Sequence, residues 1–281
     1  KERAIKCYKN AMDCSRHRGA AYLNAAIAYN EVGKFAKTHF YVDKALKCED
    51  DSEKIALMMQ TYSLALSCKW VKEWTRNINS LKELVGSIAT GGVSTNFLQP
   101  FFYHYILEID QKSKLKVAKK VANHMRYVKC DGDCGSFRHH ESKVSQDSDC
   151  KIKIGYVSVC FQKHEHGKMF QKLIGMHNRE NFEVYCYSLS PNEEHLSQML
   201  GNIDSFVPIG GMKLRQAAMK IDEDCIDILV NLDHAYSSHL ELFSLRLAPI
   251  QLSLGSDGTT GADYIDYIVA NEIMVPEQNQ V

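Results

Sequence analysis

The chain has 281 residues, of which 45% are hydrophobic and 24% are charged, an ordinary profile for a globular protein of two domains. Its 34 basic and 34 acidic side chains balance, which argues against a nucleic-acid-binding or membrane-surface protein. No apolar run approaches the roughly 20 residues of a membrane span. The chain starts at Lys1 in a helical pattern, with neither a methionine nor a signal peptide, so we expect it to begin inside a longer protein.

The first 84 residues repeat with a period of 34 residues: Ala4, Tyr8 and Ala11 recur as Thr38, Val42 and Ala45. This is the period of tetratricopeptide repeats, in which small residues let paired helices approach closely. Gly33 marks the turn of a complete repeat, and Cys68 lies near the turn of a further helical hairpin. We therefore predict tetratricopeptide-like repeats over 1–84, with a plain helical bundle as the alternative. In either case the repeat surface is expected to bind partner proteins.

A Gly-, Ser- and Thr-rich stretch at 86–96 predicts a break after the repeats. Helices at 99–110 and 112–128 are expected to fill a connecting region, 85–128. The polar stretch 129–150 predicts an interdomain linker. Four possible zinc ligands in this stretch leave a metal site open as an alternative, since zinc sites pair cysteines at such gaps. They are Cys130, Cys134, His139 and His140. The polar composition favours the linker, and we predict no metal site.

From residue 151 the pattern changes to alternating strands and helices. Strands are predicted at 152–158, 182–188, 206–209, 226–232, 250–254 and 264–270, and helices at 167–177, 194–203, 214–222 and 240–246. This alternation predicts a parallel sheet covered by helices on both faces. Ligands bind such sheets beyond the carboxyl ends of the strands. In this chain those ends carry the polar loops 158–164, 232–234 and 255–261.

Four segments of this second part carry recognisable motifs. Residues 154–158 read Ile-Gly-Tyr-Val-Ser, and Phe161 and His164 follow at set distances. His177 with 182–188 forms a second motif, 228–236 a partial third, and Arg246 to Asn271 the longest. Together they resemble the protein O-GlcNAc transferase and SPINDLY family, with almost unbroken agreement over 258–270. The order of repeats followed by these motifs is also the family's order of domains.

The resemblance implies a glycosyltransferase with two Rossmann-like lobes, the GT-B arrangement, and an active site in the cleft between them. Residues 151–281 would form the first lobe only. The family transfers N-acetylglucosamine, or fucose in some members, from a nucleotide sugar to Ser or Thr hydroxyls of nuclear and cytosolic proteins. The implied donor is UDP-GlcNAc without a further cofactor, and the implied partners are acceptor proteins. Ten cysteines without a secretory signal agree with a reducing compartment, so we expect a cytoplasmic and nuclear location.

The resemblance also points to site residues. His164 is the first catalytic candidate, because an imidazole that titrates near neutrality can deprotonate an acceptor hydroxyl or orient the sugar. His234 is the second candidate, in a loop one residue shorter than the family's. Gly258, Thr259, Thr260 and Gly261 resemble the family's substrate-facing loop. The glycines permit close backbone approach, and the hydroxyls can bond to sugar or acceptor.

The chain departs from the family pattern mainly on its loops. Cys160 replaces an Asp, Glu165 and Leu247 replace prolines, and 253–257 lacks a Trp, a Tyr and a Pro. Because loops carry function while the strands here are intact, two hypotheses stay open. The parent is either an active transferase or a catalytically inactive homologue that works as a repeat scaffold. Since the family's second lobe supplies most of the nucleotide site, we expect the isolated chain not to bind the sugar nucleotide appreciably.

Overall fold

The structure is a computed structural model that describes residues 2–12, 18–48, 52–70, 72–90, 109–128, 150–159, 161, 165–190, 203–233, 240–254, 259–273 and 275. The chain divides into two compact units, Lys1–Val117 and Ala118–Val281. Almost all of the predicted helices at 194–203 and 99–110, and the linker up to residue 149 with its possible zinc ligands, lie outside the described residues. Among the helices that are described, none combines the length and apolarity that crossing a bilayer demands.

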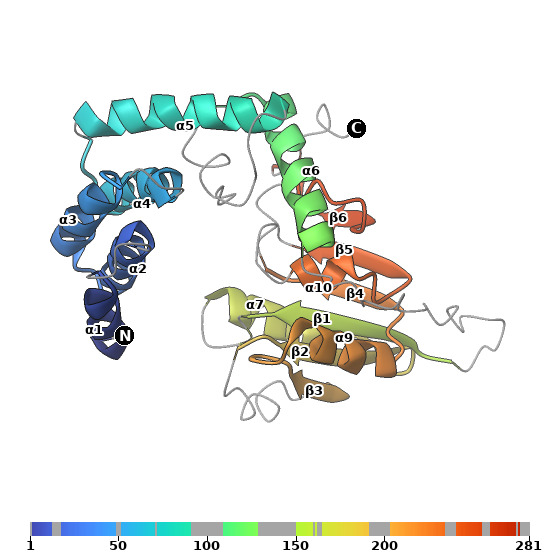
Figure 1. The fold of residues 1–281 in the computed structure, drawn as a ribbon. Helices are drawn as coiled ribbons and strands as arrows, with labels where there is room; N and C mark the ends of the chain where they lie inside the picture. Colours follow the sequence, from blue (N-terminus) through green and yellow to red (C-terminus); the bar gives the residue numbers. More distant parts are fainter. Residues whose placement is uncertain are drawn as a thin grey trace. The chain divides into compact units, whose positions relative to one another are not determined.

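The first unit is a series of helices, drawn in blue to cyan in Figure 1. They are α1 (Glu2–Ala11), α2 (Arg18–Glu31), α3 (Phe35–Ala45), α4 (Ser52–Leu66) and α5 (Lys72–Thr90). Helices α1 and α3 end 34 residues apart, at Ala11 and Ala45, and α2 and α4 begin 34 residues apart, at Arg18 and Ser52. The period predicted from sequence is therefore present in the helices. Small buried residues such as Ala26, Ala45 and Ala56 let α2, α3 and α4 approach closely.

Two of these helices end in the same hydrogen-bonded motif. The amide of Gly33 donates to the Asn30 carbonyl, and that of Lys34 donates to the Tyr29 carbonyl, while Gly33 has a φ of 70°. These are the two bonds of a Schellman motif, which closes a helix with one left-handed residue. Helix α4 ends in the same way, with Cys68 at a φ of 51°. The predicted turn near Cys68 is confirmed, although a residue with a side chain occupies the left-handed position.

The predicted break at 86–96 is wrong over its first five residues, because α5 continues through Gly86 to Thr90. Leu81 and Val85, four residues apart, are both buried, so the apolar face of the helix runs on past the predicted domain boundary at residue 84. A glycine inside a helix costs only about 1 kcal/mol relative to alanine, which this packing can offset. Helix α6 (Gln111–Val128) confirms the second predicted connecting helix and spans the division between the two units.

The second unit is built on a six-stranded sheet in which every strand pair is parallel. Its strands are β1 (Ile152–Ser158), β2 (Phe182–Ser188), β3 (Ser205–Pro208), β4 (Ile228–Asn231), β5 (Ile250–Leu254) and β6 (Tyr267–Val269). The order is β3-β2-β1-β4-β5-β6, which is the order of a Rossmann-type sheet. The prediction of a parallel sheet with intervening helices is confirmed.

Two strands are shorter than predicted, for local reasons. Strand β4 starts two residues after its predicted start, because Cys225 takes a φ of 52° and the Ile226 side chain is buried in the core. Strand β6 starts three residues late because Tyr264 and Ile265 are buried in a turn, closed by the Ile265 amide donating to the Ala262 carbonyl. Apolar residues outside the strands therefore looked like strand residues in the sequence.

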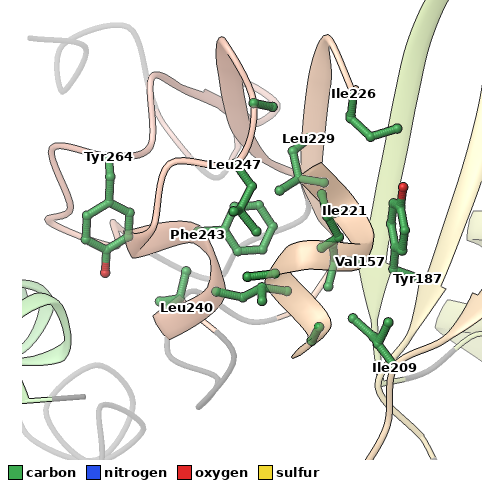
Figure 2. Packing of buried hydrophobic residues seen from close by; sticks show 14 of the residues in the cluster. Val157, Tyr187, Ile209, Ile221, Ile226, Leu229, Leu240, Phe243, Leu247 and Tyr264 are labelled. Carbon is green, nitrogen blue, oxygen red and sulfur yellow. The ribbon is translucent and has the colours of Figure 1, made fainter. Parts of the chain in front are cut away.

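Helices cover both faces of the sheet. Helix α7 (Glu165–Gly175) covers one face with Phe170 and Ile174. Helices α9 (Leu214–Glu223) and α10 (Leu240–Ser244), together with Ala122 of α6, cover the other. Figure 2 shows this second core, in which Phe243, Leu247 and Leu240 gather with Leu229, Ile221 and Val157. Side chains from both ends of the unit therefore meet in one core, which fixes the strands that carry the candidate site.

A glycine makes room for one of the largest side chains in that core. A Cβ on Gly155 would come within 2.9 Å of the Tyr187 ring and 3.0 Å of a Leu229 methyl group. Tyr187 is fully buried and donates a hydrogen bond from its hydroxyl to the Asp224 carboxylate, 2.7 Å away. The glycine of the Ile-Gly-Tyr-Val-Ser motif is thus explained by packing.

Candidate functional site

The strand order reverses between β1 and β4, since β1 connects to β2 on one side while β4 lies on the other. The crevice at the carboxyl ends of two such strands is where open parallel sheets bind ligands. Asp233, which follows β4, bridges the two strand ends. Its carboxylate accepts hydrogen bonds from the Ser158 hydroxyl at 2.7 Å and from the Val159 amide at 2.8 Å. The side chain is nearly buried, with an exposure of 8%, so the start of the loop after β1 is anchored to the start of the loop after β4.

The polar contacts continue from β4 to β5. The Asn231 side chain donates to the Asp233 carbonyl at 3.2 Å and accepts from the Asp233 amide at the same distance. It also donates to the Ser253 hydroxyl at 3.5 Å. Asn231, Ser253 and Ser158 are fully buried. Because buried polar groups are costly unless they are paired, this chain of contacts holds three adjacent strand ends in one arrangement.

The two candidate histidines lie outside the described residues, but both adjoin this anchored edge in sequence. His234 directly follows Asp233. His164 lies between Phe161 and the start of α7 at Glu165. Phe161 is fully buried, its carbonyl accepts from the Gln171 side chain at 2.8 Å, and its ring meets Phe206 edge-on at 6.2 Å. Both candidate loops therefore leave the sheet from fixed points at the carboxyl ends of β1 and β4.

Three residues of the predicted substrate-facing loop are described, and Gly258 is not. Gly261 has a φ of 62°, and a Cβ there would meet the backbone of α6, 2.5 Å from the Lys119 nitrogen. The absence of a side chain at Gly261 therefore makes room for the backbone of α6, a helix that contributes to the same unit. The Thr259 hydroxyl oxygen accepts from the Gly261 amide at 3.1 Å, and that of Thr260 accepts from the Ala262 amide at 3.2 Å. Contact of these two threonines with sugar or acceptor stays a prediction.

The longest family motif contains a structural clamp. Gln251 is fully buried, and its amide nitrogen donates to the Phe243 and Tyr264 carbonyls at 2.8 and 2.7 Å. Its amide oxygen accepts from the Leu247 amide at 3.1 Å. Beside it, Arg246 donates to the Asp266 carboxylate at 2.8 Å and to the Tyr264 and Pro249 carbonyls, each at 3.1 Å. These side chains tie the α10–β5 and β5–β6 connections together, so their place in the motif is explained by folding.

A second family motif also has a structural role. His177 lies 2.6 Å from the Tyr156 hydroxyl through its Nε2 atom, and Tyr156 is buried under α7. Burial lowers the pKa of His177, and the charge of Arg179 lowers it further. Burial raises the pKa of Tyr156 to about 12. At neutral pH the pair is therefore a neutral tyrosine hydroxyl hydrogen-bonded to a neutral imidazole, which suits a packed core and not proton transfer at the sheet edge.

Sequence reasoning missed Asp233 and Asn231 as residues that organise the site. Their position in the sequence could have indicated this role. A carboxylate that directly follows a buried strand at the topological switch point is well placed to bridge the ends of two strands. Within the described ranges, no three residues of the His, Cys, Asp and Glu types lie close enough to hold a metal ion. The possible ligands near Cys130 are not among those residues.

Comparison with known protein families gives a match to the model of glycosyl transferase family 41 over residues 71–280. The match covers about three quarters of the chain and includes the whole sheet, the switch point and the clamp. The chain belongs to glycosyl transferase family 41. The resemblance stated from the sequence motifs is thereby confirmed at the level of the family.

Two relatives of this family 41 chain carry the name of a peptide N-acetylglucosaminyltransferase. A probable UDP-N-acetylglucosamine–peptide N-acetylglucosaminyltransferase SEC of Arabidopsis thaliana is 35% identical over 187 residues, 64% of this chain and 19% of the relative. A UDP-N-acetylglucosamine–peptide N-acetylglucosaminyltransferase of Caenorhabditis elegans is 35% identical over 142 residues, 49% of this chain and 12% of the relative. The chain thus spans less than a fifth of the length of either relative.

Among solved structures, a mutant O-GlcNAc transferase of Thermobaculum terrenum matches this family 41 chain with a TM-score of 0.68. The match covers 98% of this chain and 51% of the other, at 21% sequence identity. At that identity the likeness concerns the fold alone. It extends over both units, so helices followed by a parallel α/β sheet are a combination that this family 41 chain shares with a solved structure.

Proposed function

We propose that the complete protein containing this chain is a protein O-GlcNAc transferase that moves N-acetylglucosamine from UDP-GlcNAc to Ser or Thr hydroxyls. In this proposal the helices of the first unit are tetratricopeptide repeats that bind acceptor proteins. The second unit is the first of two Rossmann-like lobes in a GT-B arrangement. Membership of glycosyl transferase family 41, the 34-residue spacing of the helices and the strand order support this assignment.

The Asp233 bridge is the observation that carries the proposal. It joins the ends of β1 and β4 at the topological switch point, where ligands of such sheets bind. The loops that contain His164 and His234 begin directly at this bridge. A buried carboxylate with two short hydrogen bonds keeps the starting points of both loops fixed.

The chemistry requires one proton acceptor from the protein. The acceptor hydroxyl oxygen forms a bond to the anomeric carbon of the sugar, while the bond from that carbon to the phosphate oxygen breaks and UDP leaves. The hydroxyl proton passes to a base, and the His164 imidazole is the proposed acceptor. Thr259 and Thr260 are proposed to orient the sugar or the acceptor through their hydroxyl groups.

Radiolabel transfer from UDP-GlcNAc to a Ser/Thr peptide by the complete protein tests this proposal. We expect transfer by the wild type and its loss, by about a hundredfold or more, in His164→Ala, because general base catalysis contributes about 10²–10⁴-fold. His177→Gln is the matched control, since His177 faces Tyr156 under α7 and should leave transfer near the wild-type rate at pH 7.5. Transfer that survives in His164→Ala at the control rate would rule out His164 as the base.

The second candidate function is a catalytically inactive scaffold that binds proteins through its helices. Departures from the family pattern at Cys160, Glu165 and 255–257 favour it, because in the sequence they follow the carboxyl ends of β1 and β5. Leu247 does not count toward it, since its amide donates to Gln251 in the clamp, a bond that a proline could not make. No transfer by the wild-type complete protein, together with retained binding of acceptor proteins, would support the scaffold.

A calorimetric titration of the isolated chain with UDP-GlcNAc tests the assignment of the second unit to a single lobe. We expect no appreciable binding, because the other lobe of the family supplies most of the nucleotide site. The complete protein, titrated in parallel, should bind the donor. Micromolar affinity in the isolated chain would show that the first lobe holds the nucleotide site by itself.

A further inference from the structure

The loop that contains Thr259, Thr260 and Gly261 packs against the middle of α6. A Cβ atom on Gly261 would lie 2.5 Å from the Lys119 nitrogen, 2.6 Å from the Ala118 carbonyl carbon and 2.8 Å from the Ala118 Cβ atom. Two of these three atoms belong to the helix backbone. Because hydrogen bonds within the helix hold that backbone, it cannot move aside as a flexible side chain could. The position of α6 therefore limits where this part of the loop can lie.

The hydrophobic core of the second unit fixes both sides of this contact. On α6, Ala118 has no exposed surface, and Ala122, about one turn further on, is buried in the core. On the loop side, Ala262 packs against the same core and Tyr264 is buried in it. Since closely packed interiors resist displacement, the helix and the loop hold each other in one arrangement.

Hydrogen bonds link this contact to the two threonines of the loop. The Gly261 amide donates to the Thr259 hydroxyl oxygen at 3.1 Å, and the Ala262 amide donates to the Thr260 hydroxyl oxygen at 3.2 Å. Thr260 is nearly buried, with an exposure of 4%, whereas Thr259 is half-buried. The Thr259 hydroxyl is thus oriented by an amide whose own position depends on α6.

We infer that Gly261 is a positioning residue for sugar transfer, which holds the Thr259 hydroxyl in place because its missing side chain lets the loop pack against α6. In this inference the glycine makes room for the helix and not for the sugar or the acceptor, and it acts through Thr259. A displacement of about 1 Å in a group that orients a substrate can cost about a hundredfold in rate. The inference rests on the proposed function, in which Thr259 orients the sugar or the acceptor.

Transfer kinetics of the complete protein with Gly261→Ala, Thr259→Ala and the double variant test this inference. We expect each single variant to lower kcat/KM by roughly tenfold or more and to raise the same KM, for the donor or for the acceptor. The double variant should match Thr259→Ala within about twofold, because Gly261 acts through that side chain. Losses that multiply in the double variant would overturn the inference. So would a Gly261→Ala variant that lowers kcat alone, as a smaller amount of folded protein would.

A second pair of variants displaces the loop from the side of the helix. Ala118→Val enlarges a residue of α6 that faces Gly261, and Ala218→Val makes the same change at an equally buried position in α9. We expect Ala118→Val to lower kcat/KM about tenfold and to raise the same KM as Gly261→Ala. Ala218→Val, the matched control, should stay within about twofold of the wild type at a temperature where circular dichroism shows both variants folded. Equal losses in the two variants would contradict the inference.

Hydrogen exchange of the complete protein separates this inference from the enzymatic proposal, because it needs no substrate. We expect the Gly261 amide, which donates to Thr259, to exchange about tenfold faster in Ala118→Val than in the wild type and at an unchanged rate in Ala218→Val. If the wild type transfers no sugar, the proposed function fails, while faster exchange in Ala118→Val alone still supports control of the loop by α6. Unchanged exchange in Ala118→Val would refute that control whether or not the protein is an enzyme.

Discussion

Two groups of buried polar side chains hold the second unit together, and they differ in what they leave for a ligand. In the clamp around Gln251, every hydrogen-bonding group of the amide is paired with the backbone, and the side chain has no exposed surface. In the bridge around Asp233, the carboxylate pairs with Ser158 and Val159 but keeps some exposure at the switch point. The clamp therefore serves the fold, while the bridge lies where function is expected.

This difference changes how the family motifs are to be interpreted. The strongest match, from Arg246 onward, contains the clamp, and the match at His177 contains a buried tyrosine–histidine pair. Both are satisfied by contacts within the unit. The departures at Cys160 and after Leu254 follow β1 and β5 in the sequence. A strong motif match thus demonstrates membership and fold, and activity has to be tested at the bridge and its loops.

The largest effect is expected from Gln251→Leu. The change keeps the size of the side chain but leaves the Leu247 amide without its acceptor and removes one of two donors from each of the Phe243 and Tyr264 carbonyls, which keep their bonds from Arg246. The unpaired amide costs about 1–3 kcal/mol and each lost bond to a carbonyl about 0.5–1.5 kcal/mol, so we expect the free energy of unfolding to fall by about 2–5 kcal/mol. Urea denaturation followed by circular dichroism measures it. The control is Gln111→Leu, at an exposed position in α6, where a change within about 0.5 kcal/mol is expected. Equal losses in the two variants would break the distinction between a clamp and a surface residue.

A smaller loss is expected from Asp233→Asn. The amide oxygen can accept from either Ser158 or Val159, but the new NH₂ group cannot accept from the other. We expect a loss of about 1–3 kcal/mol in the free energy of unfolding and faster hydrogen exchange at the Val159 amide. Glu180→Gln, at an exposed carboxylate, is the control. Unchanged exchange at Val159 would show that the bridge is not needed to anchor the loop. Loss of transfer in the complete protein without loss of stability would instead point to direct contact with substrate.

The sequence predicted the regular parts of the molecule well. Strands β1, β2 and β5 have the predicted bounds because each is an apolar run flanked by polar residues. The bounds of β4 and β6 could not be predicted, since the core buries Ile226 and Tyr264 in turns that precede the strands. Nor could the sequence show that α6 approaches Gly261, or that the Gln251 side chain forms hydrogen bonds with three backbone groups. Such contacts join residues that are distant in the chain, and only the packed fold brings them together.

A third prediction concerns pH and extends the comparison to the pair of Tyr156 and His177. Because burial lowers the pKa of His177, the unfolded chain, with a pKa of about 6.5, takes up a proton before the folded chain does. The contribution of the neutral imidazole to stability is therefore complete above about pH 6.5 and is lost as the pH falls below that value. His39 acts in the same direction in the first unit. We expect His177→Gln, measured by thermal unfolding at pH 7.5 and 5.5, to show a smaller loss of stability on acidification than the wild type. An equal or larger loss would mean that His177 is not held in its neutral form by the core.

The smallest effect is expected at the helix ends of the first unit, where two equivalent caps differ in one residue. Gly33 and Cys68 both take a left-handed φ in a Schellman motif, but only the cysteine has a Cβ in that conformation. The left-handed conformation costs a residue with a Cβ about 1–2 kcal/mol, and glycine loses part of this advantage through the greater freedom of its unfolded chain. We therefore expect Cys68→Gly to raise the free energy of unfolding by about 0.5–1 kcal/mol and Gly33→Ala to lower it by about 1 kcal/mol. Urea denaturation measures both changes. A gain of stability in Cys68→Gly together with a loss in Gly33→Ala, as expected, would show that both caps favour glycine at the left-handed position. A loss in both variants would mean that the Cys68 side chain contributes something that the repeat pattern does not require, such as a contact of its exposed thiol.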